Sequence, residues 1–580
     1  MRAILLSLAA LVGLFVACGD DDLDVTADAA ADAPDRCAYP LGRYGVGTAD
    51  TLPDLALESD TGPVRLSELR GCGDDARLWV LRVVTASCGG CLWAAAHTAE
   101  IQLPGVRVID VVVRGREGAL PTVDDLAWWR AQGGAQETLL DPGMHFAETD
   151  PGFFLPLVLL IDAARMRVLT TQSNPDGDYL VERIERELLR LDGKPLPPAR
   201  EYPLHDGLFT RTEWDLVREM ALPEDFAPPP DPTDRHADDP RAAALGARLF
   251  DDAEFSPNGV TACRSCHDPV RAFSDGLPTA HGVGVGDRNA PTVLFAAHQR
   301  WQFWDGRADT LWVQALGPFE NELEIGTTRL AVVHRIAAQY RAEFEVVYGA
   351  LPPLEQSARF PAHGKPGDPA WEAMAPADRD AVTRAFASVG KAIAAFERTL
   401  RVADNPLDRY ARGDTTALTM DQKLGLRSFL GAGCVQCHYG PRLTDDAFHV
   451  VRFGTGRRDG AADRGRLDGI SLYAASEFSA SSVYSDAPLP RPEALALVGQ
   501  SLLQGQFKTP TLRGVAVSAP FGHGGAELDL QEVTRMYGTR GLPEGDPRTV
   551  GALEPWLPEF DTHAQEHIGH MLEIMTAELK

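Results

Sequence analysis

Two copies of the motif Cys-x-x-Cys-His constrain this chain more than any other feature of its sequence. One copy consists of Cys263, Cys266 and His267, and the other of Cys434, Cys437 and His438. In such a motif the two thiols form thioether bonds to the vinyl groups of a porphyrin, and the adjacent histidine ligates its iron. A zinc site would need a second pair of cysteine or histidine ligands at short spacing, and neither copy has one. The sequence therefore predicts a cytochrome with two covalently bound c-type haems, with zinc as the minor alternative.

The length and the charge of the chain limit its architecture and its partners. At 580 residues the chain is too long for one hydrophobic core, which suggests about three or four domains. Its net charge of −28 argues against nucleic acid and anionic lipid as electrostatic partners. A redox partner with a basic face is favoured instead.

The N-terminal residues resemble the export signal of a bacterial lipoprotein. An apolar run from Ala3 to Val16 is too short to span a bilayer as a mature helix, and it ends at a lipobox-like Phe-Val-Ala-Cys. We expect residues 1–18 to be a lipoprotein signal peptide, Cys18 to carry acyl chains, and the acidic residues 19–44 to form a flexible tether. The protein would then be exported and lipid-anchored to a membrane, on the periplasmic side or at the outer membrane. An ordinary signal peptide cut nearby is the alternative.

The nine cysteines of the chain can all be assigned to a role. Besides Cys18 and the four haem cysteines, Cys88 and Cys91 form a Cys-x-x-Cys pair. Cys37 and Cys72 remain, and in an oxidising compartment they could pair as a structural disulfide. The sequence alone does not prove this pairing.

The Cys88/Cys91 pair lies between a predicted strand and a predicted helix. Residues 78–84 form an apolar, β-branched run, a helical stretch follows at residues 92–100, and buried strands are predicted at residues 106–113 and 157–162. This position is typical of a thiol-redox site, in which the helix N-terminus stabilises the attacking thiolate of Cys88 and Cys91 resolves the mixed disulfide. The alternative is a permanently oxidised, structural bridge.

The Cys-Gly-Gly-Cys sequence, together with Pro53-Asp54-Leu55 and Pro156, resembles the thioredoxin/redoxin family across residues 45–193. The resemblance implies an α/β thioredoxin-like domain and a cis peptide bond before Pro156, beside the active disulfide. It also implies a thiol-disulfide exchange partner. Ser87 stands where many relatives carry Trp, so the substrate surface of this domain would differ.

The rest of the chain is predicted to be mainly helical. Proline-rich runs bracket a linker over residues 194–238, which includes a helical piece near residues 212–220. Apolar positions at helical spacing predict helices at residues 241–250 and 381–399. A further helix over residues 420–430 leads into the second haem motif. We expect two mainly-α cytochrome c-like domains, at residues 239–405 and 406–580.

Several sequence motifs in this region resemble the bacterial dihaem cytochrome c peroxidases and the related MauG proteins. In chain order they are Leu-Gly-Ala-Arg-Leu-Phe (245–250), Arg-Asn-Ala-Pro-Thr (288–292), Phe-Trp-Asp-Gly-Arg-Ala (303–308), Phe-Lys-Thr-Pro-Thr-Leu-Arg (507–513) and Ala-Pro-Phe-Gly-His-Gly-Gly (519–525). The resemblance covers about 340 residues. It implies an oxidoreductase with a peroxidatic first domain and an electron-transfer second domain.

The resemblance also assigns roles to single residues. His267 and His438 match the proximal iron ligands. Trp304 matches an indole that lies between the two haems and relays electrons, although a Trp of the core is the alternative.

Two further positions match the distal side of a peroxidatic site, Gln314 with its amide and Glu324 with its carboxylate. Cleavage of a peroxide needs one well-placed general acid–base, which a carboxylate can be, whereas an amide can only hold the peroxide by hydrogen bonds. Glu320 and Glu322 are rivals for the role of Glu324, and a solvated acidic face is the alternative.

The predicted sixth ligands of the two haem irons resemble different subfamilies, the peroxidases at the first haem and the MauG-like proteins at the second. His281 resembles the peroxidase histidine that caps the peroxidatic iron in the resting state, with a free surface histidine as the alternative. At the second haem, Tyr537 stands at the position of the peroxidase methionine ligand, as in MauG-like proteins, and Met536 is one residue away. Tyrosine ligation would lower the reduction potential relative to methionine ligation.

Asn289, Ser518 and Pro520 match positions that bind a calcium ion between the two haem domains. The ion would use one amide oxygen, two backbone carbonyls and waters, which is an acceptable set of hard oxygen ligands. A metal-free structural loop is the alternative.

The leading hypothesis is a peroxidase that reduces hydrogen peroxide to water, with electrons passing from the second haem to the first. Its donor would be a small protein such as a cytochrome c or a cupredoxin. One alternative is a MauG-like oxidase that acts on a protein side chain through high-valent haems. The other is a non-catalytic electron-transfer cytochrome coupled to the thiol-redox domain. The Cys88/Cys91 pair could serve as reductant, sensor or client-processing arm.

Overall fold

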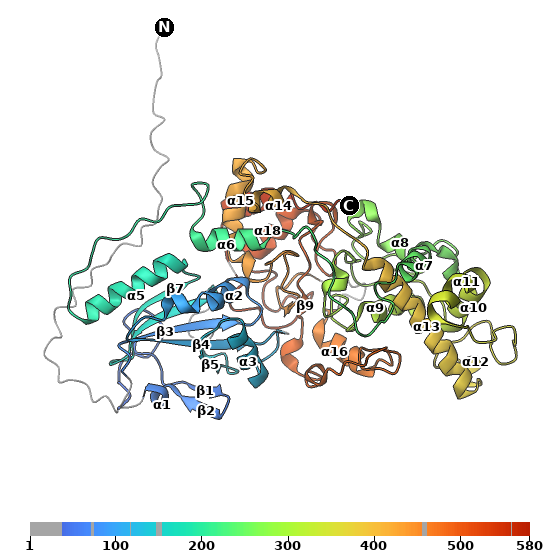
Figure 1. The fold of residues 1–580 in the computed structure, drawn as a ribbon, viewed down its shortest axis with the longest axis horizontal. Coiled ribbons are helices and arrows are strands. Elements are labelled where there is room, and N and C mark those ends of the chain that lie inside the picture. Colours follow the sequence, from blue (N-terminus) through green and yellow to red (C-terminus); the bar gives the residue numbers. More distant parts are fainter. Residues whose placement is uncertain are drawn as a thin grey trace, which may run out of the picture.

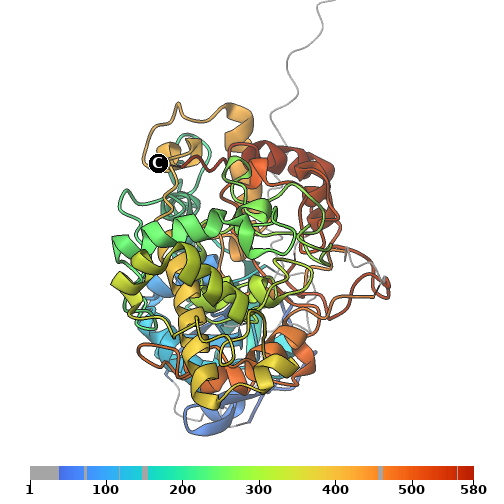
Figure 2. The ribbon, with the colours of Figure 1, turned by 90° about the vertical axis from the view of Figure 1, so that its right-hand side faces the viewer.

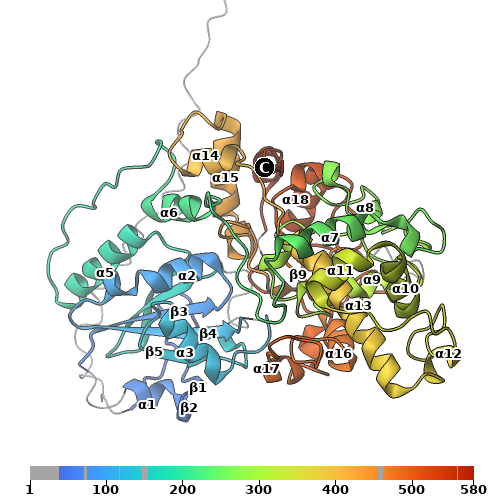
Figure 3. The ribbon, with the colours of Figure 1, turned by 45° about the vertical axis from the view of Figure 1, so that its right-hand side comes forward.

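The computed structural model describes residues 38–70, 75–116, 118–146, 154–454, 461–557 and 559–579. The predictions on Cys18, on the pairing of Cys37 with Cys72, and on the signal peptide lie outside these residues. Within them, an α/β unit precedes a longer, mainly helical region, and the two lie side by side (Figures 1 and 3). None of the helices in the described ranges is long and apolar enough to span a membrane.

A seven-stranded mixed sheet forms the core of the α/β unit, with the strand order β2-β1-β5-β4-β3-β6-β7. Strands β3, β4 and β5 are parallel to one another, whereas β6 and β7 are antiparallel to their neighbours. Strands β3 and β6 are buried along their whole length, because both faces of the sheet are covered. The strands are β1 Ala56–Ser59, β2 Gly62–Arg65, β3 Leu78–Thr85, β4 Val106–Arg114, β5 Glu137–Leu140, β6 Leu157–Asp162 and β7 Arg167–Ser173.

Helices cover the two faces of this sheet. Leu180 and Ile184 of α5 pack with Leu78 and Val80 on one face, and Trp129 of α3 belongs to the cluster on the other. The helices of the unit are α1 Leu66–Arg70, α2 Gly89–Ala96, α3 Val123–Ala131 and α5 Gly177–Leu191, and α6 Arg211–Glu219 follows in the predicted linker.

The structure confirms the thioredoxin-like fold and the three predicted strands β3, β4 and β6. The peptide bond before Pro156 is cis, as the resemblance implied. The predicted bounds of the helix after the Cys-x-x-Cys pair were wrong at both ends. This helix, α2, begins at Gly89 because the Sγ of Cys88 caps it, accepting a hydrogen bond from the N–H of Cys91 at 3.2 Å. It ends at Ala96, and a separate 3-10 turn follows at Thr98–Ile101.

The C-terminal region is mainly helical, as predicted, and its longest helix, α13, packs against α7 and α9. Figure 2 views the molecule from this end, with the green and yellow helices in front of the blue sheet. The helices are α7 Pro240–Asp251, α8 Cys263–Cys266, α9 Leu311–Glu320, α10 Arg329–Gln339, α11 Arg341–Tyr348, α12 Pro369–Glu372, α13 Pro376–Glu397, α14 Pro406–Ala411, α15 Met420–Gly431, α16 Arg466–Ala475, α17 Pro492–Leu495, α18 Leu530–Gly538 and α19 Thr562–Leu572, and the short strands are β8 Phe448–His449 and β9 Phe507–Lys508.

Segments from the second half of this region reach back onto the first half. The backbone N–H of Ala480 donates hydrogen bonds to both carboxylate oxygens of Asp309, at 2.9 and 3.1 Å. Asp486 forms ion pairs with Arg235 and Lys391. The two haem motifs are therefore carried by halves that are packed together rather than by separate bodies.

Removal of the Asp110 carboxylate should destabilise the α/β unit. Arg82 and Asp110 form an ion pair at 2.7 Å on adjacent strands, with side chains 1% and 0% exposed. Trp129 also donates a hydrogen bond to Asp110 at 2.8 Å. Because Asp110→Ala leaves the Arg82 charge buried and unpaired, we expect a loss of about 3–5 kcal/mol in the free energy of unfolding of this unit.

This loss is measured by urea unfolding followed through tryptophan fluorescence. Asp380→Ala is the matched control, because the Asp380–Arg384 pair is largely exposed and contributes little. Equal stability of the two variants would contradict the prediction.

Candidate haem-binding and catalytic site

Both Cys-x-x-Cys-His motifs face one cavity of about 590 Å³. Cys266 and His267 line it from the first motif, and Cys434, Cys437 and His438 line it from the second. Cys263, at the start of the first motif, packs against the neighbouring hydrophobic core. The fold thus brings two segments 170 residues apart in the chain to one internal space.

The two motif histidines are oriented as iron ligands require. Nδ1 of His267 donates a hydrogen bond to the carbonyl of Phe273 at 3.2 Å, and Nδ1 of His438 donates one to the carbonyl of Leu443 at 3.0 Å. Each bond fixes the tautomer and leaves the lone pair of Nε2 for a metal. Burial lowers the pKa of both imidazoles, which keeps them neutral.

The four motif cysteines are available for thioether formation. All four are free thiols in the structure. Burial raises the pKa of Cys266 and of Cys434 to about 12, which keeps these thiols protonated while no metal is bound. The basic side chains of Arg288, Arg307 and Lys508 also line the cavity and would face the propionate groups of a haem. The residues present therefore fit two c-type haems.

The distal residues Gln314 and Glu324 line this cavity as well. Gln314 lies on α9, and Glu324 lies in the turn that follows that helix. The amide of Asn321 donates a hydrogen bond to Oε1 of Glu324 at 2.6 Å, which orients the carboxyl group. Burial raises the pKa of Glu324, against the opposing charge of Arg307 and the Asn321 bond. This carboxyl group is thus poised to hold and release a proton.

The structure separates Glu324 from its two sequence rivals. Glu320 forms an ion pair with Arg329 at 2.9 Å, which in turn pairs with Glu477. Glu322 is exposed. Neither is among the residues that line the cavity, so the geometry singles out Glu324.

His281 lies beside the distal turn but outside the cavity lining. Its side chain is exposed, and its loop pairs with the distal turn through a hydrogen bond from the N–H of Val283 to the carbonyl of Glu324 at 2.8 Å. A Cβ on Gly282 would lie 2.6 Å from the Cα of Glu324, so this loop packs tightly against the distal residue. His281 is not among the residues that line the cavity in this arrangement. Its role as an iron ligand therefore stays a prediction.

Trp304 is held at the junction between the two halves of the haem region. Its indole N–H donates to the carbonyl of Asn289 at 2.9 Å, and the N–H of Lys508 donates to the Trp304 carbonyl at 2.9 Å. The amide of Asn289 bonds to the carbonyl of Pro520 at 3.3 Å, and Ser518 lines the same cavity. Two of the three predicted calcium positions, Asn289 and Pro520, are therefore in contact, and Asn289 also contacts Trp304.

Tyr537, and not Met536, faces the cavity near the second motif. Tyr537 packs edge-on against Phe453 with ring centroids 5.2 Å apart, whereas Met536 is 5% exposed within the core. Burial raises the pKa of Tyr537 above its ordinary value. This orientation favours Tyr537 over Met536 as the residue at the predicted ligand position of the second haem.

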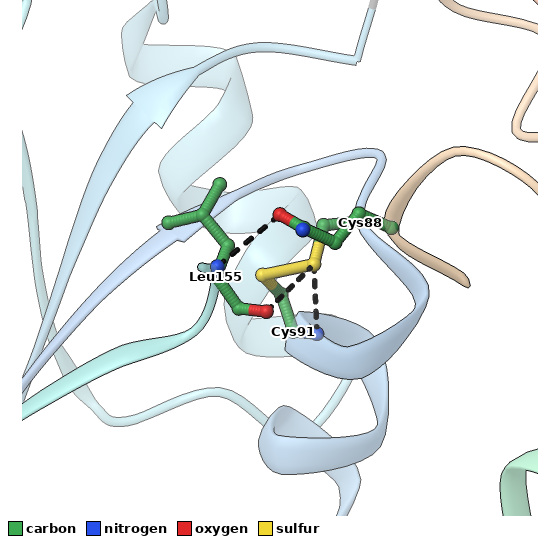
Figure 4. The surroundings of a disulfide bond; sticks show 4 residues. Cys88, Cys91 and Leu155 are labelled. Carbon is green, nitrogen blue, oxygen red and sulfur yellow. Dashed lines mark hydrogen bonds between the residues drawn. A yellow bond between two sulfur atoms is a disulfide. The ribbon is translucent and has the colours of Figure 1, made fainter. Parts of the chain in front are cut away.

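The thiol pair lies outside the cavity and is oxidised. Cys88 and Cys91 form a disulfide with their Cα atoms 5.1 Å apart. Figure 4 shows the Sγ of Cys88 beside the carbonyl of Leu155, at 3.8 Å. The pair is thus placed as in a thioredoxin-like site, next to the peptide bond before Pro156.

Sequence reasoning missed three contributors to the site. Arg307 lies close enough to Glu324 to lower its pKa, Lys508 lines the cavity, and Gln436 contacts the α/β unit. Arg307 and Lys508 lie inside the sequence motifs 303–308 and 507–513, so the sequence could have indicated both residues. Nothing in the sequence marks Gln436, because its partner Leu155 is 281 residues away.

This fold and this cavity define the chain as a c-type cytochrome with two haem attachment motifs. The family model for the di-haem cytochrome c peroxidases matches residues 240–416. A cytochrome c551 peroxidase of Pseudomonas aeruginosa is 31% identical over 307 residues, which cover 51% of this chain and 72% of that protein. The methylamine utilization protein MauG of Methylorubrum extorquens is 30% identical over 344 residues, which cover 58% of this chain and 79% of that protein. The chain belongs to the di-haem cytochrome c peroxidase/MauG family.

The α/β unit lies outside these matches. Among solved structures, a putative thiol:disulfide interchange protein DsbE from Chlorobium tepidum is similar at 23% identity and a TM-score of 0.19. That similarity covers 25% of this chain and 99% of the other.

Replacement of Tyr537 should change the reduction potential of the second haem. Methionine raises the potential of a c-type haem relative to tyrosine, so Tyr537→Met should shift the midpoint upward, on the order of tenths of a volt. Spectroelectrochemical titration of the holoprotein measures the shift. Met536→Leu is the control, because that side chain does not line the cavity. An unchanged midpoint in Tyr537→Met would exclude Tyr537 as a ligand.

Proposed function

We propose that this chain is a dihaem c-type peroxidase that reduces hydrogen peroxide to water. The observation that carries the proposal is that Gln314 and Glu324 line the same cavity as His267. A pure electron carrier has no use for a distal acid–base pair, so their position weighs against the non-catalytic cytochrome.

The residues of the distal side divide the reaction between them. Cys263, Cys266 and His267 would hold the haem, whose iron would supply the site of peroxide reduction. Gln314 holds the peroxide by hydrogen bonds, and Glu324 takes the proton from the near oxygen and delivers it to the leaving oxygen. Overall, one peroxide, two electrons and two protons give two molecules of water.

Electrons would enter at the second motif and pass by Trp304 to the first. Trp304 is suited to this step because hydrogen bonds from both halves of the haem region hold it in the cavity wall. A small donor such as a cytochrome c or a cupredoxin would be attracted by the net charge of −28 if its own face is basic.

A second candidate is a MauG-like oxidase that takes electrons from a protein side chain. Two observations favour it: Tyr537 faces the cavity, and the His281 side chain is exposed. The exposed His281 leaves the first haem site without a histidine cap from this loop, which would permit reaction with peroxide before any reduction. Tyr537 stands at the MauG-like position of the second motif.

We also propose a calcium ion and a membrane anchor. Asn289 and Pro520 are already joined by a hydrogen bond, and the carbonyl oxygens there suit a hard cation. Export to the periplasmic side, with lipidated Cys18 as anchor, is proposed from the N-terminal sequence.

Glu324→Gln should lower kcat/KM for peroxide by about 100- to 10,000-fold while both haems stay attached. Because the base form acts first and burial raises the pKa of Glu324, activity should rise with pH through a midpoint above the ordinary value of 4.5. Steady-state rates across pH, with haem stain and mass as checks, measure both effects. Glu322→Gln is the matched control, because Glu322 is exposed. Full activity in Glu324→Gln would remove this residue from the mechanism.

Stopped-flow addition of peroxide to the fully oxidised and the half-reduced protein separates the two candidate enzymes. A peroxidase in which His281 caps the first iron in the resting state predicts turnover only after half-reduction. A rapid absorbance change in the fully oxidised protein would instead support the MauG-like reaction. If neither form reacts, the carrier hypothesis replaces both.

A further inference from the structure

The Cys88–Cys91 disulfide faces the second haem motif instead of solvent. The exposed fractions of Cys88 and Cys91 are 2% and 0%. Helix α2, which begins at this disulfide, contacts the short turn Cys434–Gln436. In Figure 4 an orange ribbon, the colour of this part of the second haem domain, passes beside Cys88. We call residues 433–439 the attachment segment, because they carry Cys434, Cys437 and His438.

Two polar contacts connect the Cys88 sulfur to this segment. The carbonyl of Leu155 lies 3.8 Å from Sγ of Cys88, and the N–H of the same residue donates to Oε1 of Gln436 at 3.2 Å. Gln436 is 3% exposed and stands between the two haem cysteines in the sequence. Leu155 therefore contacts the disulfide with one end of its backbone and the haem motif with the other.

The backbone at Gly89 approaches the residue that follows the iron ligand His438. A Cβ on Gly89 would lie 2.6 Å from the Cβ of Tyr439, a distance that real side chains do not show. On the other side of the segment, a Cβ on Gly433 would lie 3.1 Å from Phe154. Glycine at position 89 permits the close approach of the Cys-Gly-Gly-Cys turn to the attachment segment, and glycine at position 433 permits the approach of Phe154.

Apolar packing holds the two units together around these contacts. Trp93 of α2 shares a buried cluster with Leu430 and Val435, and Tyr439 packs against it. Trp556, which lines the haem cavity, belongs to the core cluster of the α/β unit and lies 5.9 Å from Arg114. The disulfide is thus docked on the haem region through a buried interface.

We propose that Cys88 and Cys91 are the immediate electron donors to the haem held by Cys434, Cys437 and His438, and that an external protein dithiol reduces them in turn. The use of these electrons for peroxide reduction rests on the proposed function. While docked, the pair is closed to bulky thiol partners, so its nearest redox partner is the haem of its own chain. The external dithiol reaches Cys88 when the attachment segment separates from the turn.

The electrons and atoms of this route balance. The external dithiol reduces the Cys88–Cys91 disulfide by thiol–disulfide exchange and itself becomes a disulfide. Re-formation of the Cys88–Cys91 bond would release two protons and two electrons. The electrons would pass one at a time through the haem held at the second motif, so that each of the two ferric haems would gain one electron. One peroxide consumes two electrons and two protons, so each dithiol supports one turnover.

The test is reduction of the haems by dithiothreitol in the complete, dihaem protein without oxygen and without peroxide. The appearance of reduced-haem absorbance should be at least about tenfold slower in Cys88→Ser/Cys91→Ser than in the parent protein. Dithionite, which needs no thiol, should reduce both proteins alike. Equal rates with dithiothreitol would overturn the proposal and identify the disulfide as structural. Because peroxide is absent, this outcome leaves the proposed peroxidase function to its own tests.

Gly89→Ala tests the contact while both cysteines are kept. Alkylation and mass measurement of quenched samples give the time course of Cys88–Cys91 reduction in the same mixtures, so the delay between thiol and haem reduction isolates the second step. The added methyl group should lengthen this delay about tenfold by pushing the turn away from Tyr439. Gly431→Ala is the matched control, since a Cβ there meets nothing within 4 Å. The same delay in both variants would show that this contact is not the route.

Discussion

The buried junction around Asn289 is the interaction on which the haem region depends. Its backbone N–H donates to the carbonyl of His523, its amide donates to Pro520, and its carbonyl accepts the indole N–H of Trp304. These bonds join the segment after the first haem motif to a segment near the C-terminus. Because Asn289 and His523 are buried, breaking the bond between them would leave unpaired polar groups, and the two halves are therefore held in a single register.

This register places two haem motifs on one cavity and gives them different surroundings. The first motif shares the cavity with an amide and a carboxylate that can handle peroxide, and the second shares it with Tyr537. In the function we propose, this difference in surroundings, rather than in the motifs themselves, separates a catalytic side from an electron-accepting side. The thioredoxin-like unit adds a disulfide next to the second motif, at the side where electrons are proposed to enter.

Much of the fold could be predicted from local sequence patterns. The buried strands β3, β4 and β6 and the amphipathic helices α7, α13 and α15 were confirmed because apolar spacing reports them directly. The start of α2 was not, because two glycines in its first turn are poor helix formers and the capping role of Cys88 has no sequence signal. The site residues were also only partly predictable. The sequence indicated Glu324 together with two rivals, Glu320 and Glu322. Only the structure separated them, because Glu320 pairs with Arg329 and Glu322 is exposed.

The sequence by itself determined the covalent chemistry, because the spacing of two cysteines and a histidine within five residues is a local property of the chain. It also determined both fold classes, through strand and helix periodicity and through motifs in family order. Only the tertiary structure decided which side chains share a cavity, that Tyr537 faces it while the His281 side chain is exposed, and that the disulfide meets the attachment segment. These arrangements depend on contacts between residues hundreds of positions apart, such as Leu155 and Gln436, and packing between distant segments leaves no periodic pattern in the sequence.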